Sequence, residues 1–177
     1  MHSINGCSAG ESAPLHVEIR PAQVDEAAQL SALALEAKAH WGYPAETLES
    51  WRELLAISAA EVASKRVYVG LIDGEIVAFY SLAPSPMSWE LDNLWVSPRF
   101  MHRGLGRELL AHALASARRA GAARITVDAD PNAESFYVAC GATRYGEVPA
   151  PIPGQPERVR PQLAFDGGNG RLPSPHR

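Results

Sequence analysis

Two glycines stand two residues apart in the segment Arg103-Gly104-Leu105-Gly106, where a predicted strand gives way to a predicted helix. Glycine lets a ligand approach the backbone closely, and the first-turn amides of a helix have no intrahelical acceptor. The helix dipole adds positive potential at the same end. The junction is therefore predicted to bind a phosphate group through backbone N–H groups, with Arg103 and Arg107 adding attraction. A tight turn without a ligand remains the alternative.

Two better-known phosphate loops are excluded by the residues present. A dinucleotide fingerprint needs a third glycine or alanine where Leu109 stands. The nucleoside-triphosphate loop needs Gly-Lys-Ser/Thr, which does not occur in the chain.

Two carboxylates, Glu90 and Asp92, precede this junction in the predicted strand 89–97. The two-residue period of a strand predicts one shared face for Glu90, Asp92, Leu94 and Val96. A carboxylate can take the proton from an alkylammonium, which is almost fully protonated at pH 7. Either carboxylate of the pair could therefore act as a general base. The alternative is that they are solvated strand-edge charges or partners for a charge on the substrate.

The stretch from strand 89–97 to Gly141 resembles the Gcn5-related N-acetyltransferase (GNAT) superfamily. Residues 101–106 resemble its pyrophosphate loop, Gln/Arg-x-x-Gly-x-Gly/Ala, with Met101 departing at the first position. Residues 130–142 resemble its helix Asn-x-x-Ala/Ser-x-x-Phe-Tyr-x-x-x-Gly-Phe, with Ala142 in place of the last aromatic residue. The order of predicted elements over residues 15–165 also matches this family.

The resemblance implies acetyl-CoA as the cofactor, lying between strands 89–97 and 124–129, and no metal. It implies transfer of the acetyl group to a primary amine by direct attack in a ternary complex. Tyr137 would protonate the departing thiolate, and the Val96 amide would support the oxyanion. The general base would lie on strand 89–97, with Glu90 preferred to Asp92. The implied cofactor-binding residues are Leu94, Trp95, Val96, Met101, His102, Arg103, Gly104, Leu105, Gly106, Arg107, Asn132 and Tyr137. Two alternatives stay open: a non-catalytic CoA-binding sensor or interaction module, and transfer of a longer acyl group.

Other reactive side chains have simpler interpretations. Tyr137 could instead be a core tyrosine whose hydroxyl caps a backbone group. Cys140 is expected to be a packing residue, because no histidine or acid is spaced to activate it. His102 and His112 are expected on an exposed loop and an exposed helix face, without chemistry. Trp51 is expected in the core.

The amine acceptor is expected to meet His40, Trp41 and Tyr43, which lie between the first two predicted helices. The resemblance places the acceptor wall there, and aromatic rings can bind a cation. Packing of this loop onto the domain is the equal alternative. Arg158 or Arg160, near the proline-rich segment that joins the last two strands, could bind a carboxylate of the acceptor.

The elements that position these residues follow from hydrophobic periodicity and turn residues. Asp73-Gly74 between two β-rich runs predicts a hairpin. A helix opened by Pro21 has an expected apolar stripe that includes Val24 and Ala28. Gly121 is expected to end the predicted helix 104–120. Strands are predicted at 16–20, 66–72, 75–82, 89–97, 124–129, 143–148 and 158–165, and helices from 21 to about 41 and at 46–58, 104–120 and 130–140. The order βααβββαβαββ predicts a mixed α/β sheet flanked by helices, mostly antiparallel in this family, with one splayed parallel pair.

Composition limits the class of protein. The 177 residues carry a formal charge of −4, which gives no reason to expect nucleic acid as a partner. No stretch has the roughly 20 apolar residues that cross a bilayer, and the N-terminus lacks a signal-peptide core. Cys7 and Cys140 make no disulfide scaffold or metal spacing. We expect a cytoplasmic domain at 15–165 between flexible segments at 1–14 and 166–177, without membrane contact. A monomer and a homodimer both stay open.

Overall fold

The computed structural model describes residues 16–85 and 88–167, so Cys7 and nearly all of both predicted flexible ends lie outside the described residues. Seven strands form one mixed sheet in the order β1-β2-β3-β4-β5-β7-β6. The strands are β1 (Glu18–Pro21), β2 (Arg66–Ile72), β3 (Glu75–Pro84), β4 (Trp89–Val96), β5 (Arg124–Asp128), β6 (Thr143–Pro149) and β7 (Val159–Asp166). The helices are α1 (Ala27–Ala39), α2 (Ala45–Ser50), α3 (Ala59–Ser64), α4 (Leu105–Arg119) and α5 (Glu134–Ala139).

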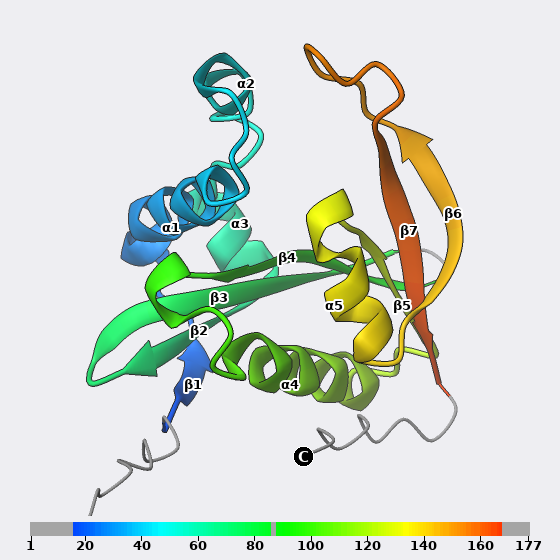
Figure 1. Cartoon of the computed structure of the whole chain (residues 1–177). Helices are drawn as coiled ribbons and strands as arrows, with labels where there is room; N and C mark the ends of the chain where they lie inside the picture. Colours follow the sequence, from blue (N-terminus) through cyan, green and yellow to red (C-terminus); the bar gives the residue numbers. More distant parts are fainter. Residues whose placement is uncertain (1–15, 86–87, 168–177) are drawn as a thin grey trace, which may run out of the picture.

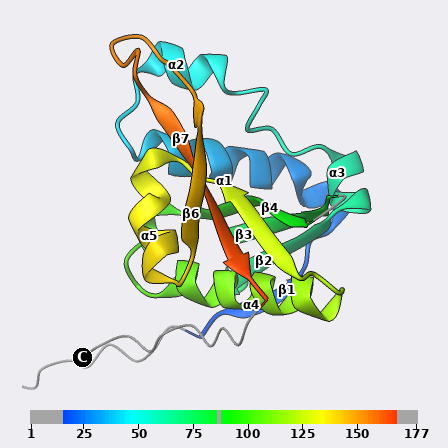
Figure 2. The same ribbon diagram turned by 90° about the vertical axis from the view of Figure 1, so that its right-hand side faces the viewer.

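The sheet consists of two antiparallel parts joined by one parallel contact. Strands β1 to β4 pair antiparallel in sequence order, and β5, β7 and β6 form the second antiparallel part. Only β4 and β5 run parallel to each other. This is the predicted fold class, a mostly antiparallel mixed sheet with one parallel pair. Figure 2 views the molecule from the side of β6 and β7.

The hairpin between β2 and β3 turns at Asp73 and Gly74, as predicted. Both residues have positive φ angles, 52° and 80°. This is the pattern of a type I′ turn, whose twist matches that of the flanking strands. The turn therefore fixes the register of the long β3 strand, on which β4 is built.

Helices cover both faces of the sheet. The amphipathic helix α4 buries Leu109, Leu110 and Ala113 completely against one face. Helix α1 covers the other face with Leu30 and Ala34, and α3 adds Val62 to the same cluster. Figure 1 shows α1 and α4 on opposite sides of β3 and β4, with α5 beside β4 and β5.

Two expectations about the N-terminal helices are wrong. The stripe expected to start at Val24 does not include it, because Val24 is 50% exposed in a short 3₁₀ turn, and Ala28 is exposed as well. The helix expected at 46–58 ends at Ser50, and Leu54 is 80% exposed in the turn that follows.

Helix α3 was not expected at all, yet its start has a clear local cause. The Ser58 hydroxyl accepts the Glu61 amide, and the Glu61 carboxylate accepts the Ser58 amide. This capping box satisfies donors at the helix start. No helix among the described residues combines the length and the apolar character that crossing a membrane requires.

Candidate active site

Strand β4 carries a bulge at Asp92. Its register against β3 pairs Ser81 with Asn93 but Leu82 with Leu91, so Asp92 is an extra residue on β4. A bulge of this kind shifts the alternation of side chains by one position. One face of β4 therefore receives odd-numbered residues before Asp92 and even-numbered residues after it.

This bulge overturns the predicted shared face. Leu91, Leu94 and Val96 all pack into the cluster around α4, although 91 and 94 differ in parity. Trp95 packs into the opposite cluster around α1. The prediction of one shared face assumed a regular strand, and it is wrong for the set Glu90, Asp92, Leu94 and Val96.

The parallel contact between β4 and β5 is very short. It consists of two residue pairs, Trp89 with Ile125 and Glu90 with Thr126. The rest of β4, from Leu91 to Val96, pairs with β3 on one side except at Asp92, and with no strand of the described residues on the other. The sheet is thus open between the two strands over most of the length of β4.

The backbone of β4 presents unpaired groups at this opening. The Ser97 amide donates to the Val77 carbonyl at 2.8 Å, in continuation of the register that pairs Val96 with Ala78. Backbone groups in an antiparallel pair point alternately toward and away from the neighbouring strand. The amides and carbonyls of Leu94 and Val96 therefore point away from β3, whereas those of Trp95 point toward it.

The start of α4 lies at one end of this opening. Gly104 is the N-cap with φ 85°, and the Glu108 amide donates to its carbonyl at 3.1 Å. The Leu105 and Gly106 amides consequently have no intrahelical acceptor. A side chain on Gly106 would lie 3.5 Å from the Phe136 ring and 3.8 Å from Val96, so this turn packs closely against α5 and the end of β4.

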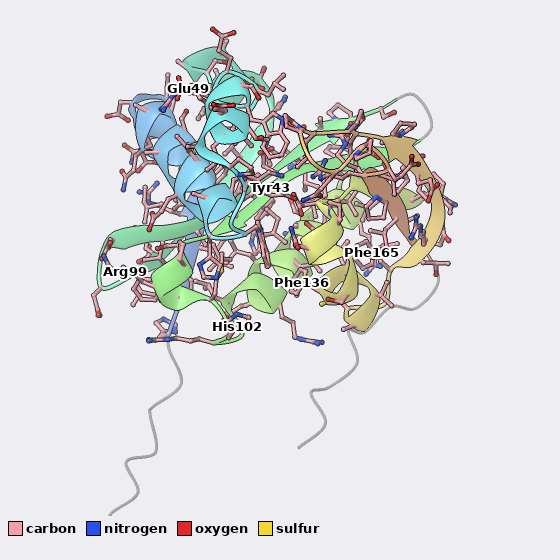
Figure 3. All side chains as sticks on the ribbon, turned by 45° about the horizontal axis from the view of Figure 1, so that its top comes forward. Tyr43, Glu49, Arg99, His102, Phe136 and Phe165 are labelled. Carbon is pink, nitrogen blue, oxygen red and sulfur yellow. The ribbon has the colours of Figure 1, made fainter. Side chains whose placement is uncertain are left out.

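The side chains of the predicted phosphate loop are arranged around this turn. His102 and Arg103 are exposed, and Figure 3 shows His102 on the outside of the loop before α4. His102 has a positive φ of 60°, and the Arg103 guanidinium lies 5.7 Å from the centre of the Phe100 ring. Met101 and Arg107 are half-buried. Arg103 is thus available to attract a phosphate at the mouth of the opening.

Tyr137 has a buried ring and a hydroxyl without a protein partner. The residue is 6% exposed, in the cluster around α4. No other described residue hydrogen-bonds the hydroxyl, and its oxygen is not among the fully buried polar atoms that lack a partner. Burial raises the pKa of the Tyr137 phenol, and Cys140 adds to the shift. The hydroxyl is therefore protonated at neutral pH and caps no backbone group.

The two carboxylates of β4 differ in their surroundings. Asp92 forms an ion pair with Lys65 at 2.7 Å and accepts a hydrogen bond from Ser81 at 3.4 Å. Glu90 has no hydrogen bond or ion pair with any described residue. Desolvation and then the charges of Asp92 and Asp128 raise the pKa of Glu90. Of the two, Glu90 is the carboxylate with a raised pKa and no ion pair among the described residues.

A buried charge cluster centred on Asp130, hereafter the Asp130 cluster, joins three segments. The Asp130 carboxylate pairs with Lys38 of α1, accepts the Tyr43 hydroxyl at 2.9 Å, and lies 3.4 Å from Arg158. It also accepts the backbone amide of Asn132 at 2.9 Å. Its side chain is 8% exposed, against 11% for Lys38 and 5% for Arg158.

Aromatic rings complete the Asp130 cluster. The Lys38 ammonium lies 4.6 Å from the centre of the Trp51 ring, and Arg158 lies 5.4 Å from the Tyr43 and Trp51 rings. The two rings meet edge to face at 4.9 Å. Trp51, expected in the core, is half-buried and packs against these cations instead.

A pocket of about 440 Å³ opens beside the Asp130 cluster. Its walls come from the α1–α2 turn, the residues before α5, and the segment between β6 and β7, and include Trp41, Tyr43, Asn132, Glu157 and Arg158. Figure 3 shows Tyr43 between the N-terminal helices and α5. The structure thus brings two of the three predicted acceptor residues to this pocket. His40 does not line it but packs edge to face against Trp41, with the ring centres 5.9 Å apart.

Two further residues test expectations about reactive side chains. His112 was expected on an exposed helix face, but it is half-buried, and its Nδ1 hydrogen-bonds the Tyr80 hydroxyl at 2.7 Å. Burial, followed by the charge of Arg119, lowers the pKa of His112. Cys140 is buried at 2% exposure, and burial raises the pKa of its thiol, as suits a packing residue. Among residues 16–85 and 88–167, no three His, Cys, Asp or Glu side chains gather as a metal site would require.

Comparisons with known proteins identify the family. The profile of the acetyltransferase (GNAT) family matches residues 28–142. The chain belongs to this family. None of the curated proteins with which the sequence was compared matches it.

Solved structures share this GNAT fold at low sequence identity. A GCN5-related N-acetyltransferase from Rhodopseudomonas palustris has a TM-score of 0.73 at 23% identity, covering 89% of this chain and 99% of its own. A PaiA N-acetyltransferase from Thermoplasma acidophilum, solved in complex with coenzyme A, has a TM-score of 0.69 at 20% identity, covering 85% and 99%. The ribosomal-protein-S18-alanine N-acetyltransferase from Escherichia coli has a TM-score of 0.66 at 17% identity, covering 92% and 99%.

Sequence reasoning about this GNAT chain missed two members of the Asp130 cluster. Counting back from Phe136 and Tyr137, the family motif places its asparagine at Asp130 rather than at Asn132, and that spacing could have drawn attention to Asp130. Lys38 lies on the buried stripe of α1, four and eight residues after Ala34 and Leu30. A lysine at such a position indicates a buried partner, because an unpaired buried charge is very unfavourable.

Proposed function

We propose that the protein transfers the acetyl group of acetyl-CoA to a primary amine, by direct attack within a ternary complex. The observation that carries this proposal is the unpaired edge of β4 beside the start of α4. A sheet opened between two parallel strands, with a helix N-terminus at one end, fits an extended ligand that ends in phosphates. The catalytic unit would be the predicted domain of residues 15–165.

The residues at the opening fit coenzyme A. The outward-pointing backbone groups of Leu94 and Val96 would pair with the amides of the pantetheine arm, as an added strand would. The Leu105 and Gly106 amides would bind the pyrophosphate, with attraction from Arg103. The coenzyme supplies an acetyl thioester, which an amine can attack without metal or redox chemistry.

The amine must lose a proton before it attacks, and we assign this step to Glu90. An alkylammonium with a pKa near 10.4 resists deprotonation at neutral pH by roughly 4.6 kcal/mol. A base with a raised pKa is better matched to this task than an ordinary carboxylate. Glu90 meets the requirement because it is unpaired and its pKa is raised. Asp92, held by Lys65, is better suited to positioning β4.

The departing sulfur needs a proton, and we assign this donor to Tyr137. Its phenol is kept protonated by burial, and no residue of the described part of the chain accepts a hydrogen bond from it. Asn132 would border the thioester end, and the pocket beside the Asp130 cluster would receive the amine between Trp41 and Tyr43.

A direct test measures coenzyme binding and turnover separately. Calorimetry with CoA and acetyl-CoA should give saturable binding, and a panel of primary amines should then release free thiol from acetyl-CoA. Binding without thiol release for every amine would instead favour a CoA-binding sensor or interaction module. Faster thiol release from acyl-CoAs of longer chain would favour transfer of a longer acyl group. No binding of CoA to folded protein would refute the proposal.

A further inference from the structure

We propose that the amine acceptor is a small molecule that carries a carboxylate, and that Arg158 binds this carboxylate in the pocket beside the Asp130 cluster. This inference rests on the proposed function, because it names the substrate class of the same site. Its basis is an excess of buried positive charge next to the pocket, together with an unsatisfied donor on Arg158.

The charges of the Asp130 cluster do not balance. Two cations, Lys38 and Arg158, share the single carboxylate of Asp130, and all three side chains are about nine-tenths buried or more. Tyr43 adds no negative charge, because its phenol has a raised pKa, for which burial is the main cause. With both cations ionised the cluster has one positive charge in excess, in surroundings where water screens it weakly, and burial accordingly lowers the pKa of Lys38. An anion in the adjoining pocket would stabilise it.

Arg158 is the member of the Asp130 cluster that can bind such an anion. It lines the pocket, whereas Lys38 and Asp130 do not. Its terminal nitrogens donate to the Ala150 carbonyl at 3.0 Å and to the Tyr43 hydroxyl at 3.1 Å, which fixes the guanidinium. Its Nε is buried and has no hydrogen-bond partner in the part of the chain described. A buried donor without a partner is costly, and a carboxylate oxygen would satisfy it once the Arg158 side chain adjusts to expose Nε to the ligand.

The other charges near the pocket are consistent with an acceptor that has an ammonium group at one end and a carboxylate at the other. Glu157 also lines the pocket, but it is exposed, so solvent screens its charge. The two acids Asp92 and Asp128 act on Glu90 more strongly than the two bases Lys65 and Arg160 do. The ammonium of the acceptor would be attracted toward Glu90 while its carboxylate is held at Arg158. A pocket of about 440 Å³ suits a small amine rather than a folded protein surface.

Arg160 provides a matched control two residues away in the same segment. It carries the same charge, but its side chain is 47% exposed, pairs with Asp128 at 3.6 Å and does not line the pocket. A general electrostatic effect would involve both arginines, whereas a specific carboxylate site involves Arg158 alone.

The experiment compares reaction products that differ only in charge. Calorimetry on the CoA-saturated protein measures binding of N-acetylglycine, N-acetylleucine and N-acetylphenylalanine, each beside its neutral C-terminal amide. The acids should bind about tenfold tighter than the amides, as loss of one hydrogen bond to a charged group predicts. Arg158→Gln should bring acid and amide to within about twofold, and Arg160→Gln should keep the difference.

The wild-type comparison alone can overturn the inference, even if Arg158→Gln fails to fold. Equal binding of acids and amides, or no binding of any acid at millimolar concentration, would refute it. Arg158→Lys keeps the charge without the Nε donor and should retain only part of the preference. Thiol release separates the two proposals: turnover of amino acid amides as fast as amino acids would refute the carboxylate site and leave the acetyltransferase intact. Preferred binding of acids without any turnover would refute the acetyltransferase and leave the carboxylate site intact.

Discussion

The turn at the start of α4 can be tested by adding one methyl group to Gly104. Its φ of 85° disfavours any residue with a Cβ, and a Cβ built there meets no atom within 4 Å. The strain of Gly104→Ala thus comes from backbone conformation alone and should be about 1–2 kcal/mol. This corresponds to a melting temperature lower by about 2–8 °C for a domain of this size.

The same substitution should weaken coenzyme binding through the amides that follow Gly104. If the strained turn relaxes, the Leu105 or Gly106 amide moves out of position. A backbone hydrogen bond to a phosphate oxygen contributes roughly 1.5–3 kcal/mol. Loss of one such bond should raise the Kd of CoA about ten- to 150-fold. Calorimetry measures the Kd, and urea unfolding measures the stability.

Gly121 supplies a matched control at the other end of α4. It too has a positive φ, 90°, and open space around a built Cβ. Gly121→Ala should therefore lose about the same stability as Gly104→Ala, but the Kd of CoA should change by no more than about twofold. An equal loss of CoA affinity in both variants would refute our reasoning, because it would trace the effect to stability rather than to the turn.

Three other substitutions test the remaining assignments. Tyr137→Phe should lower kcat about tenfold or more while the Kd of acetyl-CoA changes only a few-fold, because the phenol donates a proton without holding the coenzyme. Glu90→Gln should abolish the acidic limb of the pH–rate profile, which in the wild type should lie above the usual range of a glutamate because the pKa of Glu90 is raised. Asp130→Asn should lower the free energy of unfolding by about 3–5 kcal/mol, because it leaves two buried cations without a carboxylate. Adding Lys38→Met to that variant should restore part of the loss.

Each of these outcomes has a contrary result. An unchanged kcat in Tyr137→Phe would remove Tyr137 from the mechanism. An acidic limb lost in Asp92→Asn but kept in Glu90→Gln would transfer the base to Asp92. For Asp130, burial opposes ionisation, but the hydrogen bond and charge of Lys38 outweigh it and hold its pKa below the ordinary value. Its contribution to stability should therefore be complete at neutral pH and disappear as the pH falls below the pKa of an unfolded aspartate. Asp130→Asn should remove this acid dependence, and a variant that retained it would contradict the assignment.

Elements whose cause is local were predictable from the sequence. The hairpin at Asp73 and Gly74 and the amphipathic helix α4 were both expected near their observed bounds, because turn residues and periodicity determine them. Helix α3 was also determined locally, by the capping box of Ser58 and Glu61, and was overlooked. Its apolar face is short, so periodicity gave little signal.

Features that depend on a distant partner were not predictable in the same way. The bulge at Asp92 exists only relative to β3, so nothing in the strand itself marks the extra residue. The Asp130 cluster joins Lys38 to residues about 90 and 120 positions later in the sequence. Arg158 could be suggested as a carboxylate-binding residue, but its burial and its difference from Arg160 required the folded structure.

The bulge in β4 lets odd-numbered residues before Asp92 and even-numbered residues after it point to the same side of the sheet. If Asp92 were a regular strand residue, strict alternation would turn either Leu91 or Leu94 out of the apolar layer over α4. Deleting this one residue would instead remove the bulge, keep the pairing of Ser81 with Asn93, and leave Leu91 and Leu94 two positions apart on the same face. The extra residue Asp92 thus lies between the part of β4 that carries Glu90 and the part whose backbone groups are unpaired.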